Sequence, residues 1–164
     1  MFLRALFLCC WIPLHAFAVS NGDTPPAVTG ADLQNGQPVD LAALRGRVVL
    51  VDFWASWCAP CLKSLPLYAS LRNEFARSDF EIIAINVDED LADAQAFLKR
   101  VEVQFPIVHD DGGLAGAWSP PTMPTSFLID RQGLVKSRHI GFKPGDIDAL
   151  RTEVRSLIEA HDAP

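Results

Sequence analysis

The sequence predicts an α/β fold in which a mixed sheet is covered on both faces, and two patterns support this prediction. From residue 48 to residue 118, strand-like apolar runs alternate with segments of helical periodicity. Further on, two strand-like runs joined by a turn at 131–133 precede a final amphipathic segment. The alternation favours parallel strands with helices packed across them, and the turn favours an antiparallel pair. With 164 residues, 49% apolar and 21% charged, the chain suits one compact domain.

The expected strands are short apolar runs bounded by polar or turn-forming residues. They cover 48–54, 80–87, 105–108, 126–130 and 134–140. The first two are continuously apolar, which is typical of strands buried on both faces. Upstream, Gln34–Gln37 (Gln-Asn-Gly-Gln) is a turn signal within residues 31–44 and predicts a small hairpin or cap.

Four helices are expected from apolar residues at helical spacing. The first follows Cys58, the second spans 91–101, the third spans 113–118, and the fourth begins near Asp146. The first should kink at Pro66, because a proline inside a helix cannot donate its backbone hydrogen bond. The acidic run 88–90 is expected to cap the second helix.

Residues 1–18 resemble an export signal peptide. Arg4 supplies a basic start, residues 5–17 are uncharged and mostly apolar, and small residues precede Val19. The run is too short to span a bilayer comfortably, so a periplasmic location is expected. The alternative is an uncleaved anchor that holds the domain on the outer side of the inner membrane. Residues 19–30 are expected to be a flexible lead-in, and 31–164 the folded domain.

Removal of this signal would also remove Cys9 and Cys10. The mature chain would then contain only Cys58 and Cys61, three residues apart. An exported protein without further cysteines has no framework of structural disulfides, so we expect this pair to perform chemistry.

The position of the two cysteines indicates thiol–disulfide exchange. They follow a buried strand and open a helix, where unpaired N–H groups and the helix dipole would stabilise a Cys58 thiolate. Cys61 lies on the same helical face and can close a small disulfide. We expect Cys58 to attack a client disulfide and Cys61 to resolve the mixed disulfide. Ala59 and Pro60 lie between them and should tune the reduction potential.

Two neighbouring side chains are expected to assist the cysteines. Asp52 lies in the apolar run 48–54, where burial of an unpaired carboxyl group would raise its pKa. It could therefore accept the proton when Cys61 becomes a thiolate. Trp57 is expected to shield the thiols and contact clients.

Composition argues against several other classes of function. The formal net charge is −6, and no basic patch suggests binding to nucleic acid. A structural zinc site needs four ligands, and His109, His139 and His161 lack ligand spacing. We therefore expect a monomer with no metal and no cofactor beyond the redox-active Cys58–Cys61 disulfide.

Three separated motifs resemble the thioredoxin superfamily. These are Trp57–Cys61 (Trp-Cys-Ala-Pro-Cys), Pro66 five residues later, and Met123–Thr125 (Met-Pro-Thr) before a strand. The exported context and the run 121–130 are most similar to the TlpA-like branch of exported thiol–disulfide reductants, some of which serve cytochrome c maturation. The resemblance implies a thioredoxin-like three-layer α/β/α sandwich, with an N-terminal β-hairpin extension and an inserted helix and strand segment.

The same resemblance implies further site residues and partners. Pro124 should be a cis-proline facing the dithiol, and Met123 and Thr125 should help to bind the client. The expected partners are client proteins with disulfides or thiols and a membrane-bound electron donor. Many members of the branch carry a glutamate three residues after the second cysteine, but this chain has Ser64, expected to be solvated. Asp52 is therefore the candidate for handling the proton.

Two alternatives remain open at this stage. The same residues at a higher reduction potential would serve a disulfide oxidase or isomerase. The second alternative is a copper-binding chaperone with a thioredoxin-like fold. That class resembles a Cys-x-x-x-Cys pattern, with three residues between the cysteines, whereas only two residues separate Cys58 from Cys61.

Overall fold

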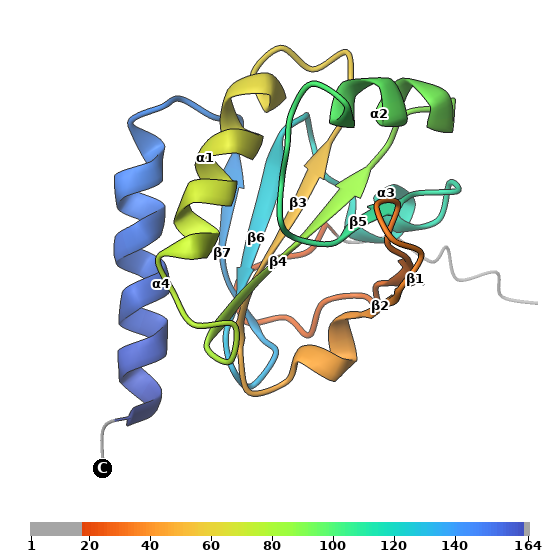
Figure 1. Ribbon diagram of the computed structural model, residues 1–164. Helices are drawn as coiled ribbons and strands as arrows, with labels where there is room; N and C mark the ends of the chain where they lie inside the picture. The colour runs from red at the N-terminus through yellow and green to blue at the C-terminus, as the bar shows by residue number, and fades with distance from the viewer. Residues whose placement is uncertain (1–17, 163–164) are drawn as a thin grey trace, which may run out of the picture.

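A five-stranded sheet in the order β5-β4-β3-β6-β7 forms the centre of the computed structural model, which describes residues 18–162 (Figure 1). The strands are β3 (Val48–Trp54), β4 (Phe80–Asn86), β5 (Ile107–His109), β6 (Thr125–Ile129) and β7 (Val135–Ile140). β3, β4 and β5 run parallel, whereas β6 is antiparallel to both of its neighbours. The sheet is therefore mixed, as the sequence predicts.

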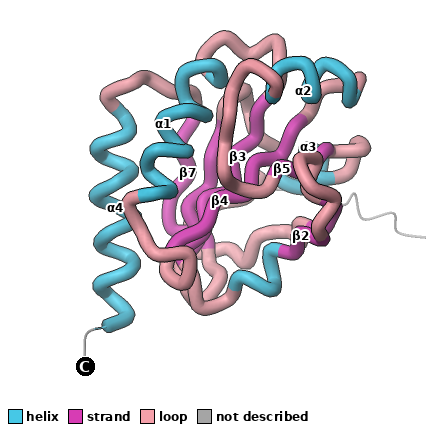
Figure 2. The backbone as a smooth tube through the Cα atoms, in the orientation of Figure 1, coloured by secondary structure: helices cyan, strands magenta, loops and turns pink. Residues whose placement is uncertain are grey.

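Helices cover both faces of this sheet (Figures 1 and 2). The first core cluster joins one sheet face to α1 (Cys61–Asn73), α2 (Leu91–Leu98) and α4 (Asp146–Asp162). The second joins the other face to α3 (Leu114–Trp118) and the 3₁₀ helix Leu41–Leu44. The predicted three-layer α/β/α sandwich is confirmed.

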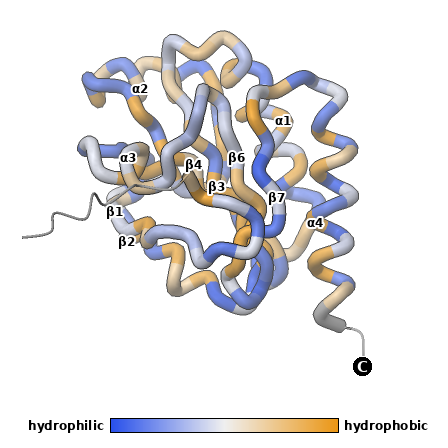
Figure 3. Tube along the Cα trace, turned by 180° about the vertical axis from the view of Figure 1, so that it is seen from behind, coloured by the Kyte–Doolittle hydropathy of each residue, from blue (hydrophilic) through white to orange (hydrophobic). Residues whose placement is uncertain are grey.

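Every residue of β3 is buried, and alternate residues serve the two cores. Leu50 and Trp54 face the α1 side, while Val51 and Phe53 face the α3 side. This follows from the two-residue period of a strand. Seen from behind, hydrophobic residues concentrate along the central strands, as a sheet covered on both faces requires (Figure 3).

The predicted hairpin is present at the edge of the molecule. β1 (Thr29–Ala31) pairs antiparallel with β2 (Pro38–Asp40). Gly36 in the connecting turn has φ of +73°, a conformation that glycine adopts without steric cost. The Asp32 carboxylate accepts a hydrogen bond from the Ile107 N–H at 3.1 Å, which holds the hairpin against β5.

Residues 19–30 differ from the expected flexible lead-in. Val19 and Val28 are buried in the second core cluster. The Gly22 N–H donates to the Val135 carbonyl at 2.7 Å, and the Val135 N–H donates to the Asp23 carbonyl at 3.0 Å. Residues 22 and 23 therefore pair with the start of β7, and Val19 and Val28 pack into the core although most of the segment is polar.

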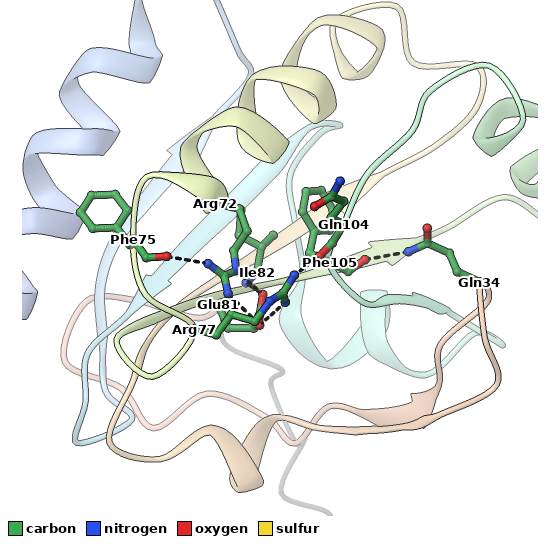
Figure 4. Close-up of polar contacts among 8 residues, drawn as sticks. All are labelled: Gln34, Arg72, Phe75, Arg77, Glu81, Ile82, Gln104 and Phe105. Carbon is green, nitrogen blue, oxygen red and sulfur yellow. Dashed lines mark hydrogen bonds and ion pairs between the residues drawn. The ribbon is translucent and has the colours of Figure 1, made fainter.

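A buried ion cluster lies where α1 ends and β4 begins (Figure 4). Glu81 receives the Arg72 Nε at 2.7 Å, the Arg77 Nη1 at 3.2 Å and the Ile82 N–H at 3.0 Å. Arg72 also donates to the Phe75 carbonyl at 3.0 Å. The cluster ties the C-terminal end of α1 to the sheet, at the end opposite the cysteines.

The proposed signal, residues 1–17, lies outside the described residues. Within the described part of the chain, no helix has both the length and the apolar character needed to cross a membrane.

Candidate active site

Three segments meet at one edge of the sheet, and together they form the candidate active site. β3 and β4 are parallel, so their carboxyl ends Trp54 and Asn86 lie side by side. β6 runs the other way and begins at Thr125 opposite Phe53. The loop after β3 therefore meets the loop before β6, which brings the cysteine motif next to Met123 and Pro124.

Cys58 and Cys61 are joined by a disulfide, with a Cα–Cα distance of 5.3 Å. Cys58 retains 4% exposure, whereas Cys61 is completely buried. The predicted pairing is therefore present in the oxidised state. An approaching disulfide can reach Cys58 before it can reach Cys61.

The start of α1 differs slightly from the prediction. The helix begins at Cys61, so Cys58 lies in the preceding turn and not in the helix itself. The Cys61 N–H nevertheless points to the Cys58 Sγ at 3.3 Å and to the Cys58 carbonyl at 3.0 Å. A helix N-terminus therefore faces the Cys58 sulfur, and this arrangement favours a thiolate after reduction.

Asp52 lies on the sheet face covered by α1. It alternates with Val51 and Phe53, so its side chain points to the same face as Leu50 and Trp54, which pack with Cys61. The carboxyl group is fully buried, and neither oxygen has a hydrogen-bond partner within residues 18–162. Burial raises the pKa of Asp52 well above its usual range. Both the burial and the direction of the pKa shift match the expectation.

Ser64 is a correction to the sequence analysis. It was expected to be solvated, but it is completely buried. It follows Cys61 at the i+3 position, so it lies on the same inward face of α1. Its hydroxyl donates to the Cys61 carbonyl at 3.5 Å. The position where the resemblance led us to look for a carboxylate is thus occupied by a small, buried hydroxyl.

The two tryptophans near the motif lie in different environments. Trp57 is 70% exposed and stands beside the buried cysteines at the surface. Trp54 is fully buried, with its ring 4.8 Å from that of Phe97. Trp57 is therefore positioned for contact with another molecule, whereas Trp54 belongs to the core.

The loop before β6 carries the other predicted binding residues. The Met123–Pro124 peptide bond is cis, as the resemblance implies. Met123 is half-buried and Pro124 is buried. Thr125 is fully buried, and its hydroxyl donates to the Thr122 carbonyl at 2.7 Å. The Thr125 side chain is thus occupied within the loop, and only its backbone can face a client.

Sequence reasoning missed a polar network behind the cysteine loop. Asp88 was expected to cap α2, a role that Asp90 performs by accepting the Ala92 N–H at 2.8 Å. Asp88 instead accepts the Ser56 N–H at 3.0 Å and the Ser56 hydroxyl at 3.0 Å. It also accepts the Asn86 side-chain amide at 2.8 Å. The signal was available in principle, because Ser56 and Asp88 each follow one of two adjacent parallel strands.

This network extends to the third parallel strand. The Asn86 Oδ1 is 3.1 Å from the His109 Nδ1 at the end of β5. The network links the loop that carries Trp57 and Cys58 to β4 and β5, so the loop is held from behind by side chains. The His109 side chain is half-buried.

Comparison with known proteins agrees with this geometry. Residues 20–154 match the family model described as Redoxin. The thiol-disulfide oxidoreductase ResA of Bacillus cereus is 36% identical over 121 residues, which cover 73% of this chain and 69% of the relative. ResA of Geobacillus thermodenitrificans is 36% identical over 120 residues, covering 73% of this chain and 68% of that protein.

Solved structures give the same result. A putative thiol:disulfide interchange protein DsbE from Chlorobium tepidum has a TM-score of 0.80 and 34% identity, covering 86% of this chain and 99% of that structure. A putative protein disulfide isomerase from Bacteroides thetaiotaomicron has a TM-score of 0.76 and 29% identity, covering 86% and 91%. The chain therefore belongs to the redoxin family and, within the thioredoxin superfamily, to the TlpA-like branch of thiol–disulfide oxidoreductases.

Proposed function

We propose that this oxidoreductase reduces disulfides in client proteins outside the cytoplasm. The observation that carries the proposal is the Cys58–Cys61 disulfide at the start of α1, in which Cys58 is the more exposed sulfur. In the reduced protein the Cys58 thiolate attacks a client disulfide and forms a mixed disulfide. Cys61 then attacks the Cys58 sulfur, and the client leaves as a thiol.

Asp52 is proposed to accept the Cys61 proton in the second step. Its carboxyl group lies beneath α1 on the Cys61 side of the sheet, with no competing hydrogen-bond partner among the described residues. Burial raises its pKa, so the group accepts a proton more readily than an ordinary carboxylate does. Asp52→Asn should therefore slow resolution of the mixed disulfide at neutral pH, and unchanged single-turnover kinetics would contradict this role.

Clients are proposed to dock across the Met123–Pro124 loop and Trp57. Within residues 18–162, no hydrogen bond uses the backbone N–H or carbonyl of Met123, so both can pair with an extended client segment. The exposed Trp57 ring would cover the other side of the client. Ala59 and Pro60 set the spacing between the two sulfurs.

A reducing poise is favoured by the charges near the motif. No basic residue lies between Cys58 and Cys61 to stabilise the thiolate. The charged group bonded to the same loop is Asp88, through Ser56, and a nearby carboxylate disfavours a thiolate. A less stable thiolate makes the dithiol easier to oxidise, which suits a reductant.

The reduction potential against glutathione tests the direction of exchange. A reduction potential of about −270 mV, together with insulin reduction that is lost in Cys58→Ser, would support the proposal. A reduction potential of about −120 mV would indicate an oxidase or isomerase instead. Tight retention of Cu(I) without insulin reduction would favour the copper chaperone.

The client and the location need separate tests. In Cys61→Ala the mixed disulfide cannot be resolved, so clients should remain attached to Cys58 in the exporting host. Recovery of apocytochrome would identify cytochrome c maturation as the process served, whereas many unrelated exported proteins would indicate general repair.

Residues 1–18 fused to a reporter that is active only after export would test the periplasmic signal and show whether it is cleaved or stays as an anchor. A membrane-bound electron donor would then restore the dithiol.

A further inference from the structure

The loop 55–60, which joins β3 to α1 and carries the attacking cysteine, is held from outside by one side chain. Within residues 18–162, every hydrogen bond of this loop stays inside the segment 55–64, except those from Ser56 to Asp88. Asp88 lies just after β4. It is therefore the only hydrogen-bonding link between the cysteine loop and a distant segment of the described chain.

The link consists of three contacts, which we call the Ser56–Asp88 clamp. The Ser56 N–H is 3.0 Å from each oxygen of the Asp88 carboxylate. The Ser56 hydroxyl donates to the Asp88 Oδ1, also at 3.0 Å. Hydrogen bonds to a charged acceptor are stronger than those between neutral groups, so the clamp fixes Ser56 firmly.

Ser56 is part of the turn that places Cys58. The Cys58 N–H donates to the Ala55 carbonyl at 3.1 Å, so Ser56 and Trp57 are the two central residues of a four-residue turn. A bond that fixes Ser56 therefore also fixes the backbone on which Trp57 and Cys58 stand.

Asp88 is itself held by the sheet. It is 3% exposed, and Asn86, the last residue of β4, is fully buried. The Asn86 Nδ2 donates to the Asp88 Oδ2 at 2.8 Å, and the Asp88 N–H donates to the Asn86 Oδ1 at 3.2 Å. The Nδ1 of His109, the residue of β5 that pairs with Asn86, is 3.1 Å from the same Oδ1. The clamp thus connects the loop to the centre of the sheet.

The clamp has its greatest consequence when the disulfide opens. In the oxidised protein the bond between Cys58 and Cys61 restrains the loop by itself. Reduction removes this covalent restraint, and the clamp is then the restraint that comes from outside the loop. A loop that stays ordered loses little conformational entropy when its two sulfurs rejoin, so the closed form is favoured.

We propose that Asp88 is a positioning residue, which acts through Ser56 to hold the reduced loop in the shape that closes the disulfide. The inference rests on the proposed exchange by Cys58 and Cys61. No hydrogen bond joins Asp88 to either cysteine in the described residues, so its effect passes through the turn. Because the clamp favours closure, it makes the dithiol a stronger reductant.

The equilibrium with glutathione measures this effect. The protein dithiol and one glutathione disulfide give the protein disulfide and two glutathione thiols, so two electrons pass from the protein sulfurs to glutathione. In Asp88→Ala, the equilibrium constant for closure should fall about ten-fold, as when part of the strength of a hydrogen bond to a charged group is lost. For this two-electron couple, the reduction potential should rise by about 30 mV.

Variants of Ser56 separate the bond from the charge of Asp88. Ser56→Ala removes the hydroxyl contact, keeps the carboxylate and changes a half-buried loop residue, so it also serves if Asp88→Ala does not fold. Its equilibrium constant for closure should fall about three-fold, since the N–H contacts remain. Ser56→Thr keeps a hydroxyl and should match the wild type.

Glu89→Gln is the matched control. Glu89 is the exposed acid next to Asp88, and its side chain makes no hydrogen bond within residues 18–162. The variant removes a negative charge from the same segment but leaves the clamp intact. Its equilibrium with glutathione should equal that of the wild type.

Urea unfolding of both redox forms distinguishes positioning from a general loss of stability. Without the clamp, the reduced loop recovers conformational entropy, whereas the oxidised loop is still restrained by its disulfide. Asp88→Ala should therefore destabilise the oxidised form more than the reduced form. If both forms lost the same stability and the glutathione equilibrium did not change, the inference would be wrong, and the proposed exchange would stand.

The remaining outcomes are also decisive. If Ser56→Ala matches the wild type, the clamp does not act through Ser56, and the inference is wrong even if Asp88→Ala changes the equilibrium through its charge. If Glu89→Gln shifts the equilibrium as much as Asp88→Ala does, charge and not positioning governs it. If the wild-type protein neither closes its disulfide against glutathione nor reduces insulin, the proposed function itself fails, and the inference fails with it.

Discussion

Asp52 and Glu81 are buried carboxyl groups on adjacent strands, and their surroundings are opposite. Glu81, at the start of β4, is bound by Arg72, Arg77 and the Ile82 N–H. Asp52, near the end of β3, has no bonded partner among the described residues. The paired acid anchors α1 to the sheet, whereas the unpaired acid lies below the cysteines.

The difference indicates what each end of the sheet is for. A buried carboxylate with charge-assisted bonds fixes its neighbours in place. A buried carboxyl group without partners favours its neutral form, so its protonation can change during a reaction. The end of the sheet away from the cysteines has the paired acid, and the end beside the cysteines has the unpaired one.

Breaking the paired acid should have the largest effect on stability. In Arg72→Met, Glu81 loses its buried partner, and the free energy of unfolding should fall by about 3–5 kcal/mol. Urea unfolding of the oxidised protein measures this. Arg77→Met is the matched control, because that side chain is largely exposed and should cost much less. If the free energy of unfolding fell equally in the two variants, the buried arginine would contribute no more than the exposed one, contrary to this prediction.

Removing the unpaired acid should change the pH dependence of stability. The folded pKa of Asp52 is raised, so the unfolded chain ionises first as the pH passes about 3.9. Wild-type stability should then fall by up to about 1.4 kcal/mol per pH unit until the folded pKa is reached. Asp52→Asn has no carboxyl group at this position and should not show this fall in stability. The free energy of unfolding of both oxidised proteins is measured as a function of pH. If the two curves are parallel, the pKa of Asp52 is not raised in the folded protein.

Asp110 should show the opposite sign. Burial raises its pKa, but N–H groups of 112–115 outweigh this effect, and the net shift is downward. Its carboxylate accepts the Leu114 N–H at 2.8 Å and the Ala115 N–H at 2.7 Å, at the start of α3. The stabilisation is present at neutral pH and is lost as the pH falls through the folded pKa. Asp110→Asn should cost about 0.5–2 kcal/mol near pH 7 in thermal or urea unfolding. A cost that grows toward acid pH would be inconsistent with this assignment.

The smallest effect is expected at an exposed ion pair. Arg151 of α4 bonds to Glu74 at 2.7 Å and also contacts Asp148. Solvent and salt screen such pairs, so Arg151→Ala should leave the urea midpoint nearly unchanged, and any difference should vanish in high salt. If Arg151→Ala lowered the stability as much as Arg72→Met, and high salt did not remove the effect, burial would not explain why the two ion pairs differ in strength.

Much of the fold could be predicted from local patterns. The strand predicted over 48–54 matches β3 residue for residue, and the hairpin around Gln34–Gln37 is present. Continuous apolar runs and turn-forming residues are strong local signals. The ends of elements were less accurate: the strand expected over 105–108 is β5 at 107–109, because pairing with β4 sets its limits.

Contacts between distant segments could not be read in the same way. Ser64 was expected to be solvated, but it lies on the buried face of α1. Asp88 resembled a helix cap, yet it bonds to Ser56, thirty-two residues away. In both cases residue type was a poor guide, because the deciding partner comes from another element.

By itself, the sequence determined the two cysteines, their place after a buried strand and the elements around them, since these depend on neighbouring residues and hydrophobic spacing. Only the tertiary structure decided which acid is paired and which is not. It also placed Ser126 directly opposite Asp52 and left Cys58 as the more exposed sulfur. The physical reason is that burial and pairing depend on the register of strands and the packing of helices, which bring together side chains far apart along the chain.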